Sequence, residues 1–239
     1  MSENRLCQNF LFIEEVDSTN RVLKEMALAG SPMGTVLAAE RQSGGYGSKG
    51  RTWISEKGGA FFSCLLPWNE HFTLFPLVVG VACARALRTF SPEVFLKWPN
   101  DLVLRGRKLG GILVESRHGL WAIAGIGINI FPCSLPEAAS LSEIEKSGKI
   151  ATQDLISLVL FELEAAWEDL LDEKTEEILA AWSALSLTIG QEVVLQSNGS
   201  SHSGRALSLD PLGGLVISRE GSVEVFYEGT LRRPDGGYA

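Results

Sequence analysis

The sequence changes character near residue 186, and no other feature constrains the fold as strongly. Before that point, strand-like runs alternate irregularly with long helical patterns, of which the last ends near residue 185. After it, only short strand-like runs remain, separated by Gly, Ser and Asn turns, at 193–195, 204–207, 214–217 and 223–227. We therefore predict two domains, residues 1–185 and residues 186–239, the second of which is a small β-barrel.

The first domain mixes strand and helix patterns without a strict strand–helix–strand order. Strand patterns cover 9–15, 34–40, 60–66, 94–97, 102–104, 111–115 and 121–130. Helical spacing of apolar residues covers 22–27, 75–86, 156–171 and 175–185. Because a doubly wound parallel sheet needs regular alternation, this order predicts the α+β class, with a mixed β-sheet backed by helices.

Charge and hydropathy exclude several classes of function. The formal net charge of −8 argues against broad nucleic-acid binding, which needs an excess of cations. The apolar run at 74–84 is shorter than the roughly 20 residues that span a bilayer, and residues 1–8 lack a signal sequence. The four cysteines and three histidines show no zinc-site spacing. We expect a cytoplasmic protein that binds neither membrane nor nucleic acid.

A glycine-rich segment at 42–53 reads QSGGYGSKGRTW. Glycines let backbone N–H groups approach a phosphate closely, and Lys49 and Arg51 can neutralise its charge. The segment matches neither the Walker A pattern nor the dinucleotide fingerprint. By itself it fits a flexible polar loop equally well.

A second segment combines Lys97-Trp98-Pro99-Asn100-Asp101 with RKLGGI at 107–112. Asp101 offers the hard oxygen ligand that Mg²⁺ shares with phosphates. Lys97 and Lys108 can face the negative charge that develops at phosphorus. The alternative is a surface turn with solvated charges.

Two further segments carry polar groups beside apolar ones. Residues 124–129 form an apolar strand with two glycines and a final Asn129, whose amide can donate and accept as an adenine edge requires. The alternative is a core strand with an edge bulge. At 15–20, the Ser18 and Thr19 hydroxyls can bind a small polar ligand, or they can cap the helix that follows.

In this order, the four segments resemble those of the biotin protein ligases, in the form without an N-terminal DNA-binding domain. The resemblance implies a catalytic sheet of the class II aminoacyl-tRNA synthetase and biotin ligase type, followed by an SH3-like β-barrel. It also implies a biotin–acetyl-CoA-carboxylase ligase. Biotin and ATP would give biotinyl-5′-AMP and pyrophosphate, and the biotinyl group would pass to a lysine of the biotin carboxyl carrier domain of a carboxylase.

The resemblance also assigns roles to residues of the four segments. Biotin would contact Ser18, Thr19, Gln42, Tyr46, Gly47, Ser48 and Lys108. ATP and the adenylate would contact Arg51, Trp53, Asn100, Asp101 and Asn129. Lys108 and Arg51 would be the catalytic cations, and Asp101 would hold the Mg²⁺ that accompanies ATP as a substrate complex. No tightly bound prosthetic group is expected.

The sequence departs from the family pattern at two positions. The family loop carries arginines where Tyr46 and Ser48 stand, and the second of these helps to retain the adenylate. Either Lys49 reaches in from the next position, or the adenylate is held loosely. A first strand near residue 9 leaves no room for a helix-turn-helix repressor domain.

Two alternative functions remain open. A lipoate or octanoate ligase or transferase of the same superfamily is the first alternative, and a non-catalytic biotin-binding module is the second. The family suggests a homodimer that pairs through the catalytic sheet. The family also suggests that the C-terminal domain helps to position ATP or the acceptor domain, although no residue of 186–239 shows chemistry by its sequence.

Overall fold

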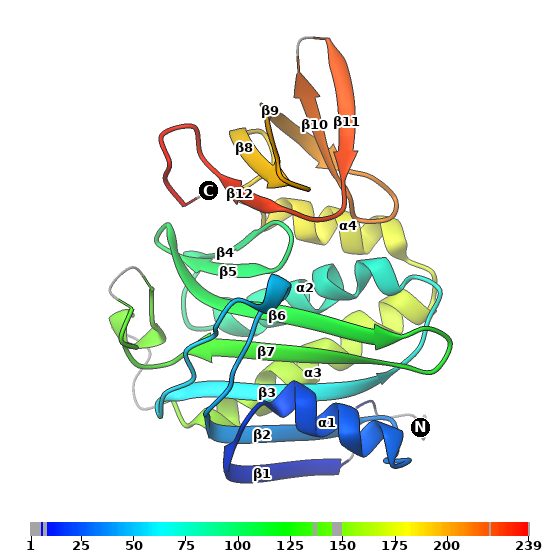
Figure 1. The fold of residues 1–239 in the computed structure, drawn as a ribbon, viewed down its shortest axis with the longest axis vertical. Helices are drawn as coiled ribbons and strands as arrows, with labels where there is room; N and C mark the ends of the chain where they lie inside the picture. The colour runs from blue at the N-terminus through cyan, green and yellow to red at the C-terminus, as the bar shows by residue number, and fades with distance from the viewer. Residues whose placement is uncertain (1–5, 7–8, 136–137, 145–149, 220, 239) are drawn as a thin grey trace.

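A seven-stranded mixed sheet forms the larger part of the molecule (Figure 1). The computed structural model describes residues 6, 9–135, 138–144, 150–219 and 221–238. The strand order is β1-β2-β3-β7-β6-β5-β4, in which β1 and β2 are parallel and all other neighbours are antiparallel. The strands are β1 Asn9–Val16, β2 Thr35–Gln42, β3 Gly59–Pro67, β4 Val94–Lys97, β5 Asp101–Leu104, β6 Arg107–Arg117 and β7 Trp121–Asn129.

The two faces of this sheet bury different groups. The helices α2 (Phe75–Arg88), α3 (Thr152–Leu171) and α4 (Thr175–Ala184) lie behind it in Figure 1 and enclose the main hydrophobic core. The helix α1 (Thr19–Leu28) covers part of the other face through a smaller apolar cluster around Leu23 and Ile123. Because side chains alternate along a strand, β7 sends its alanines and isoleucines 126 and 128 to the core and its glycines to the α1 face.

The C-terminal unit, residues 192–238, is a five-stranded antiparallel sheet of order β11-β10-β9-β8-β12. Its strands are β8 Glu192–Ser197, β9 Ser200–Leu209, β10 Leu215–Arg219, β11 Ser222–Phe226 and β12 Thr230–Arg232, of which the sequence did not predict the last. Single turns of 3-10 helix occur at η1 Ser48–Gly50, η2 Phe72–Leu74 and η3 Leu141–Glu143. The predicted α+β class, with a small β-unit after the helix-backed sheet, is confirmed.

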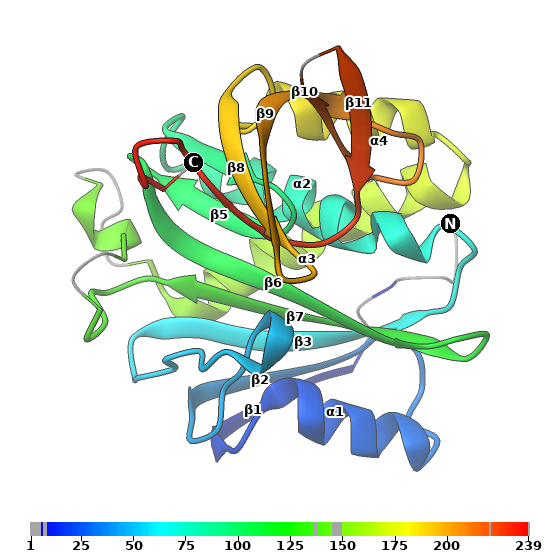
Figure 2. The ribbon, with the colours of Figure 1, turned by 45° about the horizontal axis from the view of Figure 1, so that its top comes forward.

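Trp98 attaches the C-terminal unit to the main sheet. The C-terminal strands lie above that sheet in Figure 2. The indole N–H of Trp98 donates to the Gly213 carbonyl at 3.1 Å, and its backbone N–H donates to Thr188 Oγ1 at 3.2 Å. Lys97 and Trp98 are only 4% and 1% exposed, so the alternative of a surface turn is wrong. One core cluster runs through both sheets, and the division at residues 185 and 186 stays a prediction.

Across the described ranges, no helix is long and apolar enough to cross a membrane. Residues 1–5, 7 and 8, on which the prediction of a missing signal sequence rests, lie outside the described residues.

Candidate active site

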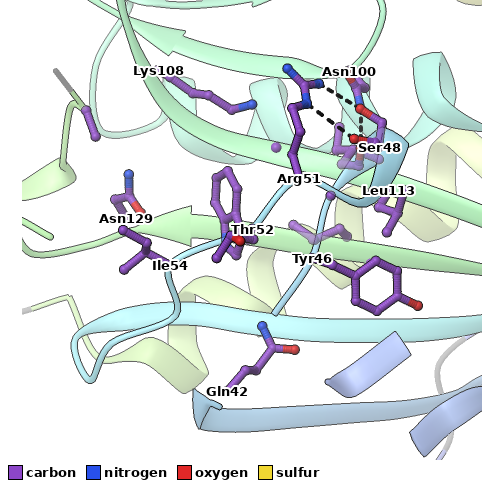
Figure 3. A pocket seen from close by; sticks show the side chains of 18 of the residues that line it. Gln42, Tyr46, Ser48, Arg51, Thr52, Ile54, Asn100, Lys108, Leu113 and Asn129 are labelled. Carbon is purple, nitrogen blue, oxygen red and sulfur yellow. Dashed lines mark hydrogen bonds between the residues drawn. The ribbon is translucent and has the colours of Figure 1, made fainter. Parts of the chain in front are cut away.

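A cavity of about 300 Å³ opens on the α1 face of the main sheet, below the glycine-rich loop (Figure 3). The structure brings almost all of the predicted site residues to its wall: Ser18, Thr19, Gln42, Tyr46, Gly47, Ser48, Arg51, Trp53, Asn100, Lys108 and Asn129. Asp101 is the exception, because it lies behind Lys108. The segments thus meet in space although they are far apart in the sequence.

The two glycines of β7 make room for side chains that cross the sheet. A Cβ atom at Gly125 would overlap Asn20 Oδ1, and one at Gly127 would lie 2.5 Å from Trp53 Nε1. The strand is central, pairing in unbroken register with β3 and β6, so the alternative of an edge bulge is wrong. Glycine is required here because a rigid neighbour occupies the space that a side chain would need.

Neutral hydrogen-bonding groups line the end of the cavity at the start of α1. The Thr19 backbone N–H and hydroxyl both donate to Gln42 Oε1, at 2.7 and 3.1 Å. Ser63 Oγ lies 2.8 Å from Thr19 Oγ1 and 2.6 Å from Asn20 Oδ1. Ser18 occupies the N-cap position of α1, but its side chain makes no capping hydrogen bond. The alternative that its hydroxyl only caps the helix is therefore wrong.

Tyr46 anchors the glycine-rich loop to β6. Its hydroxyl donates to Glu115 Oε2 at 2.7 Å, and the Asn20 amide donates to the same oxygen at 2.8 Å. Burial, with the adjacent carboxylate, raises the pKa of Tyr46, so the phenol stays protonated at neutral pH. No role was predicted for Asn20, Ser63 or Glu115. A signal existed only for Ser63, which is a single hydroxyl residue within an otherwise apolar strand.

Arg51 lies against its own loop. Its Nη2 donates to Ser48 Oγ at 2.8 Å and its Nε to the Ser48 carbonyl at 3.2 Å, as the dashed lines in Figure 3 show. Lys49 instead points to the C-terminal unit, where its Nζ lies 3.8 Å from Glu228 Oε2. Lys49 is not among the described residues that line the cavity, so its position does not support the hypothesis that it replaces the missing arginine.

Lys108 faces the cavity because the ladder between β5 and β6 shifts register. Asp101 pairs with Gly111, but Val103 pairs with Lys108, so β6 carries one extra residue between these pairs. Paired residues share a face of the sheet, and a shift by one residue reverses that face. The bulge therefore turns Lys108 to the side of Asp101, with which its ammonium forms an ion pair.

Cations gather at the other end of the cavity, where Lys108 lies. Arg51, Lys108 and Arg232 line it, and Lys97 lies beneath them beside the Asp101 carboxylate. Burial lowers the pKa of Lys97 to about 8; the neighbouring cations act in the same direction, and Asp101 opposes them. Four cations around one carboxylate make an end that favours a polyanion.

Two of the residues that line the cationic end come from the C-terminal unit. Arg232 ends β12, and Tyr238 donates a hydrogen bond from its hydroxyl to Asp101 Oδ2. Burial and this carboxylate raise the pKa of Tyr238, so it is a neutral donor. The C-terminal unit therefore supplies two side chains to the wall of the cavity. Its strand pattern gave no signal for either residue.

Trp53 carries a polar atom that the protein leaves unused. Its Nε1 is buried and has no hydrogen-bond partner within the described ranges, although buried donors are usually satisfied. Lys108 Nζ lies 5.2 Å from its ring centroid.

Asn129, 6% exposed, donates from Nδ2 to the Ala139 carbonyl at 3.1 Å. No group of three metal-ligating side chains occurs in the described part of the chain.

Comparisons with known proteins agree with this geometry. The model of the Biotin/lipoate A/B protein ligase family matches residues 12–129. The structure is similar to that of the biotin protein ligase from Aquifex aeolicus in complex with biotin and ATP, with a TM-score of 0.85 and 31% identity over 95% of this chain and 99% of that chain. The chain belongs to the biotin protein ligases.

Curated biotin protein ligases are similar over most of the chain. The biotin–acetyl-CoA-carboxylase ligase of Mycobacterium tuberculosis is 29% identical over 236 residues, covering 92% of this chain and 86% of that protein. The bifunctional ligase/repressor BirA of Escherichia coli is 28% identical over 229 residues, covering 90% of this chain and 71% of that protein. The family resemblance drawn from four short segments is confirmed, whereas the roles of individual residues stay predictions.

Proposed function

We propose that this biotin protein ligase activates biotin with ATP and transfers it to a lysine of the biotin carboxyl carrier domain of a carboxylase. The observation that supports this most directly is one cavity with two unlike ends. Figure 3 shows Gln42 on one side and Lys108, Arg51 and Asn100 toward the other. A neutral hydrogen-bonding end suits the ureido ring and chain of biotin, and a cationic end suits a triphosphate.

In the first step, a carboxylate oxygen of biotin forms a bond to the α-phosphorus of ATP, and the bond to pyrophosphate breaks. Negative charge grows on the oxygens around phosphorus, and fixed cations stabilise it more in the transition state than in the ground state. We assign this role to Lys108 and Arg51, both of which line the cavity. Holding the two substrates in one cavity also removes the cost of bringing them together.

At the neutral end, the proposed biotin contacts are Ser18, Thr19, Gln42, Tyr46, Gly47 and Ser48, with Lys108 at the carboxylate. Thr19 and Gln42 already bond each other. Their orientation is therefore set before biotin arrives, which reduces the entropy lost on binding. The Tyr46–Glu115 bond holds the loop that would cover the ligand.

At the cationic end, Trp53 and Asn129 would contact the adenine, and Arg51, Asn100 and Asp101 would serve the phosphates. The orphaned Trp53 Nε1 supports a ligand acceptor beside it. Mg²⁺ usually binds through one or two carboxylates together with substrate phosphates. Asp101 does not fit that role as it is placed, because it does not line the cavity and its two oxygens already bond Lys108 and Tyr238. When bound, the ion would neutralise phosphate charge.

In the second step, the amine of the carrier lysine attacks the carbonyl carbon of the mixed anhydride, an amide forms, and AMP leaves. Two similar curated proteins are biotin–acetyl-CoA-carboxylase ligases, which supports acetyl-CoA carboxylase as the source of the carrier domain. We place the reaction in the cytoplasm.

The test follows pyrophosphate release from biotin and ATP, and then label on a purified carrier domain. We expect both with biotin, and neither when EDTA removes Mg²⁺. A preference for octanoate would support the lipoate-type alternative. Tight biotin binding without pyrophosphate would support the non-catalytic binding module.

We also propose that two copies pair through the catalytic sheet. The strand β1 is an open edge bonded only to β2 in the described sheet, and its apolar residues are 39–44% exposed: Phe10, Leu11, Phe12 and Ile13. Exposed apolar edges favour pairing with another chain. Light scattering should report a dimer that Phe12→Lys converts to a monomer. A wild-type monomer at high micromolar concentration would contradict the proposal.

A further inference from the structure

Tyr238 contacts both charged residues of the Lys97–Asp101 turn. Its hydroxyl donates to Asp101 Oδ2, while Lys108 pairs with Asp101 Oδ1. Its ring lies under Lys97 Nζ, which is 3.5 Å from the ring centroid. Besides Arg232, which lines the cavity, the C-terminal unit therefore reaches the proposed nucleotide end through this aromatic side chain.

The two donors on Asp101 fix the plane of its carboxylate. A carboxylate with one partner can rotate about its last bond, whereas donors on both oxygens leave one orientation. Because Lys108 shares this carboxylate, the position of its ammonium depends on the same arrangement. Removing the phenolic hydroxyl would free one oxygen and loosen both charged groups.

The ring of Tyr238 packs against the second charged group, the Lys97 ammonium. Lys97 is 4% exposed and lies among other cations, so few water molecules can solvate its ammonium. The face of an aromatic ring attracts a cation, most strongly where water is excluded. The ring thus keeps Lys97 in place under the cavity.

A tight turn directs Tyr238 to this position. Gly236 N–H donates to the Arg233 carbonyl at 2.9 Å, and Arg233 N–H donates to the Gly237 carbonyl at 3.0 Å. Gly236 has a φ of +82°, a conformation that favours glycine, and Asp235 accepts from the Gly237 N–H at 2.9 Å. The segment is therefore a folded turn that presents a side chain.

We propose that Tyr238 is a positioning residue of the adenylation site, holding Asp101, and through it Lys108, in place for the nucleotide while it covers Lys97. This proposal rests on the proposed function. It gives Tyr238 a specific task in ATP binding and none in biotin binding.

The test compares Tyr238→Phe, Tyr238→Leu and a matched control, Tyr227→Phe. Tyr227 also donates its hydroxyl to an aspartate of the C-terminal unit, Asp210, but it lies outside the cavity. Isothermal titration of biotin-saturated protein with α,β-methylene-ATP and Mg²⁺ measures nucleotide affinity without turnover. KM and kcat are then measured for ATP and for biotin.

We expect Tyr238→Phe to weaken nucleotide binding about tenfold, the usual loss for a hydrogen bond to a charged group. Tyr238→Leu should weaken it further, because Lys97 also loses its cover. The KM for biotin should stay constant in both variants. Tyr227→Phe should match the wild type throughout.

Three outcomes would overturn the proposal. Nucleotide affinity equal to wild type in both Tyr238 variants would show that the residue positions nothing, and tighter binding would show that it obstructs the site. An equal loss for biotin and nucleotide with a lower Tm would show a purely structural role. If the wild type binds nucleotide but releases no pyrophosphate, the proposed function fails while the titration still decides the role of Tyr238.

Discussion

The two ends of the cavity are built on opposite physical principles. At the neutral end, Thr19, Gln42 and Ser63 belong to one hydrogen-bond network, which continues to Asn20 and Ser55. At the cationic end, four positive groups surround Asp101, so positive charge is left in excess. A saturated network selects a neutral ligand by shape and by exchange of hydrogen bonds, whereas excess charge selects a polyanion and stabilises charge that grows during reaction. Substitutions at the neutral end should therefore change mainly the binding of biotin, whereas substitutions at the cationic end should change mainly the binding and reaction of ATP.

The largest expected effect is on catalysis, at Lys108. We predict that Lys108→Ala lowers the rate of pyrophosphate release by about 10²–10³-fold, the usual loss of one group that stabilises transition-state charge. Biotin affinity should fall by much less than the rate, because Lys108 would contact only the biotin carboxylate and the neutral end is untouched. The control is Lys57→Ala, which also breaks an ion pair, with Glu40, but outside the cavity. Unchanged turnover in Lys108→Ala would remove the lysine from the mechanism.

The two glycines of β7 allow the same substitution, glycine to alanine, to be made at each end of the cavity. Gly125→Ala would push against Asn20 and should raise the KM for biotin, whereas Gly127→Ala would push against Trp53 and should raise the KM for ATP. Overpacking costs about 1–3 kcal/mol, so both variants should lose roughly 2–10 °C in Tm. Calorimetry and steady-state kinetics measure both effects. If both variants change both KM values equally, the two ends are not independent.

A smaller effect is expected from Thr19→Val, which keeps the shape but removes the hydroxyl between Gln42 and Ser63. Loss of one neutral hydrogen bond of about 1 kcal/mol should raise the KM for biotin about three- to tenfold and leave that for ATP unchanged. Thr35→Val is the matched control, because Thr35 is also buried and bonds the Pro32 carbonyl away from the cavity. A larger change for ATP than for biotin would reverse the assignment of the ends.

The smallest effect concerns release of the adenylate. Lys49 pairs with Glu228 instead of pointing into the cavity, and we predict diffuse biotinylation of added albumin. Ser48→Arg should reduce this label about two- to fivefold, the range of a solvent-screened charge contact. Ser43→Arg adds the same charge to the loop outside the cavity lining. Label confined to the carrier domain in the wild type would contradict the prediction.

By itself, the sequence determined most of the elements, the class of fold and most of the polar residues around the cavity. Apolar periodicity is local, so β3, α2, β7 and α3 could be predicted within a few residues of their observed ends. The four polar segments carried the family resemblance, and nearly all of their predicted residues line one cavity.

Only the tertiary structure decided how the charged groups are arranged. The bulge that turns Lys108 toward Asp101 depends on pairing between two strands, and no pattern within either strand encodes it. Tyr238 meets Asp101 across 137 positions of sequence, through a turn whose direction is set by how the C-terminal unit packs on Trp98. Local sequence fixes which groups a segment offers, whereas contacts between distant segments fix which of those groups face one another.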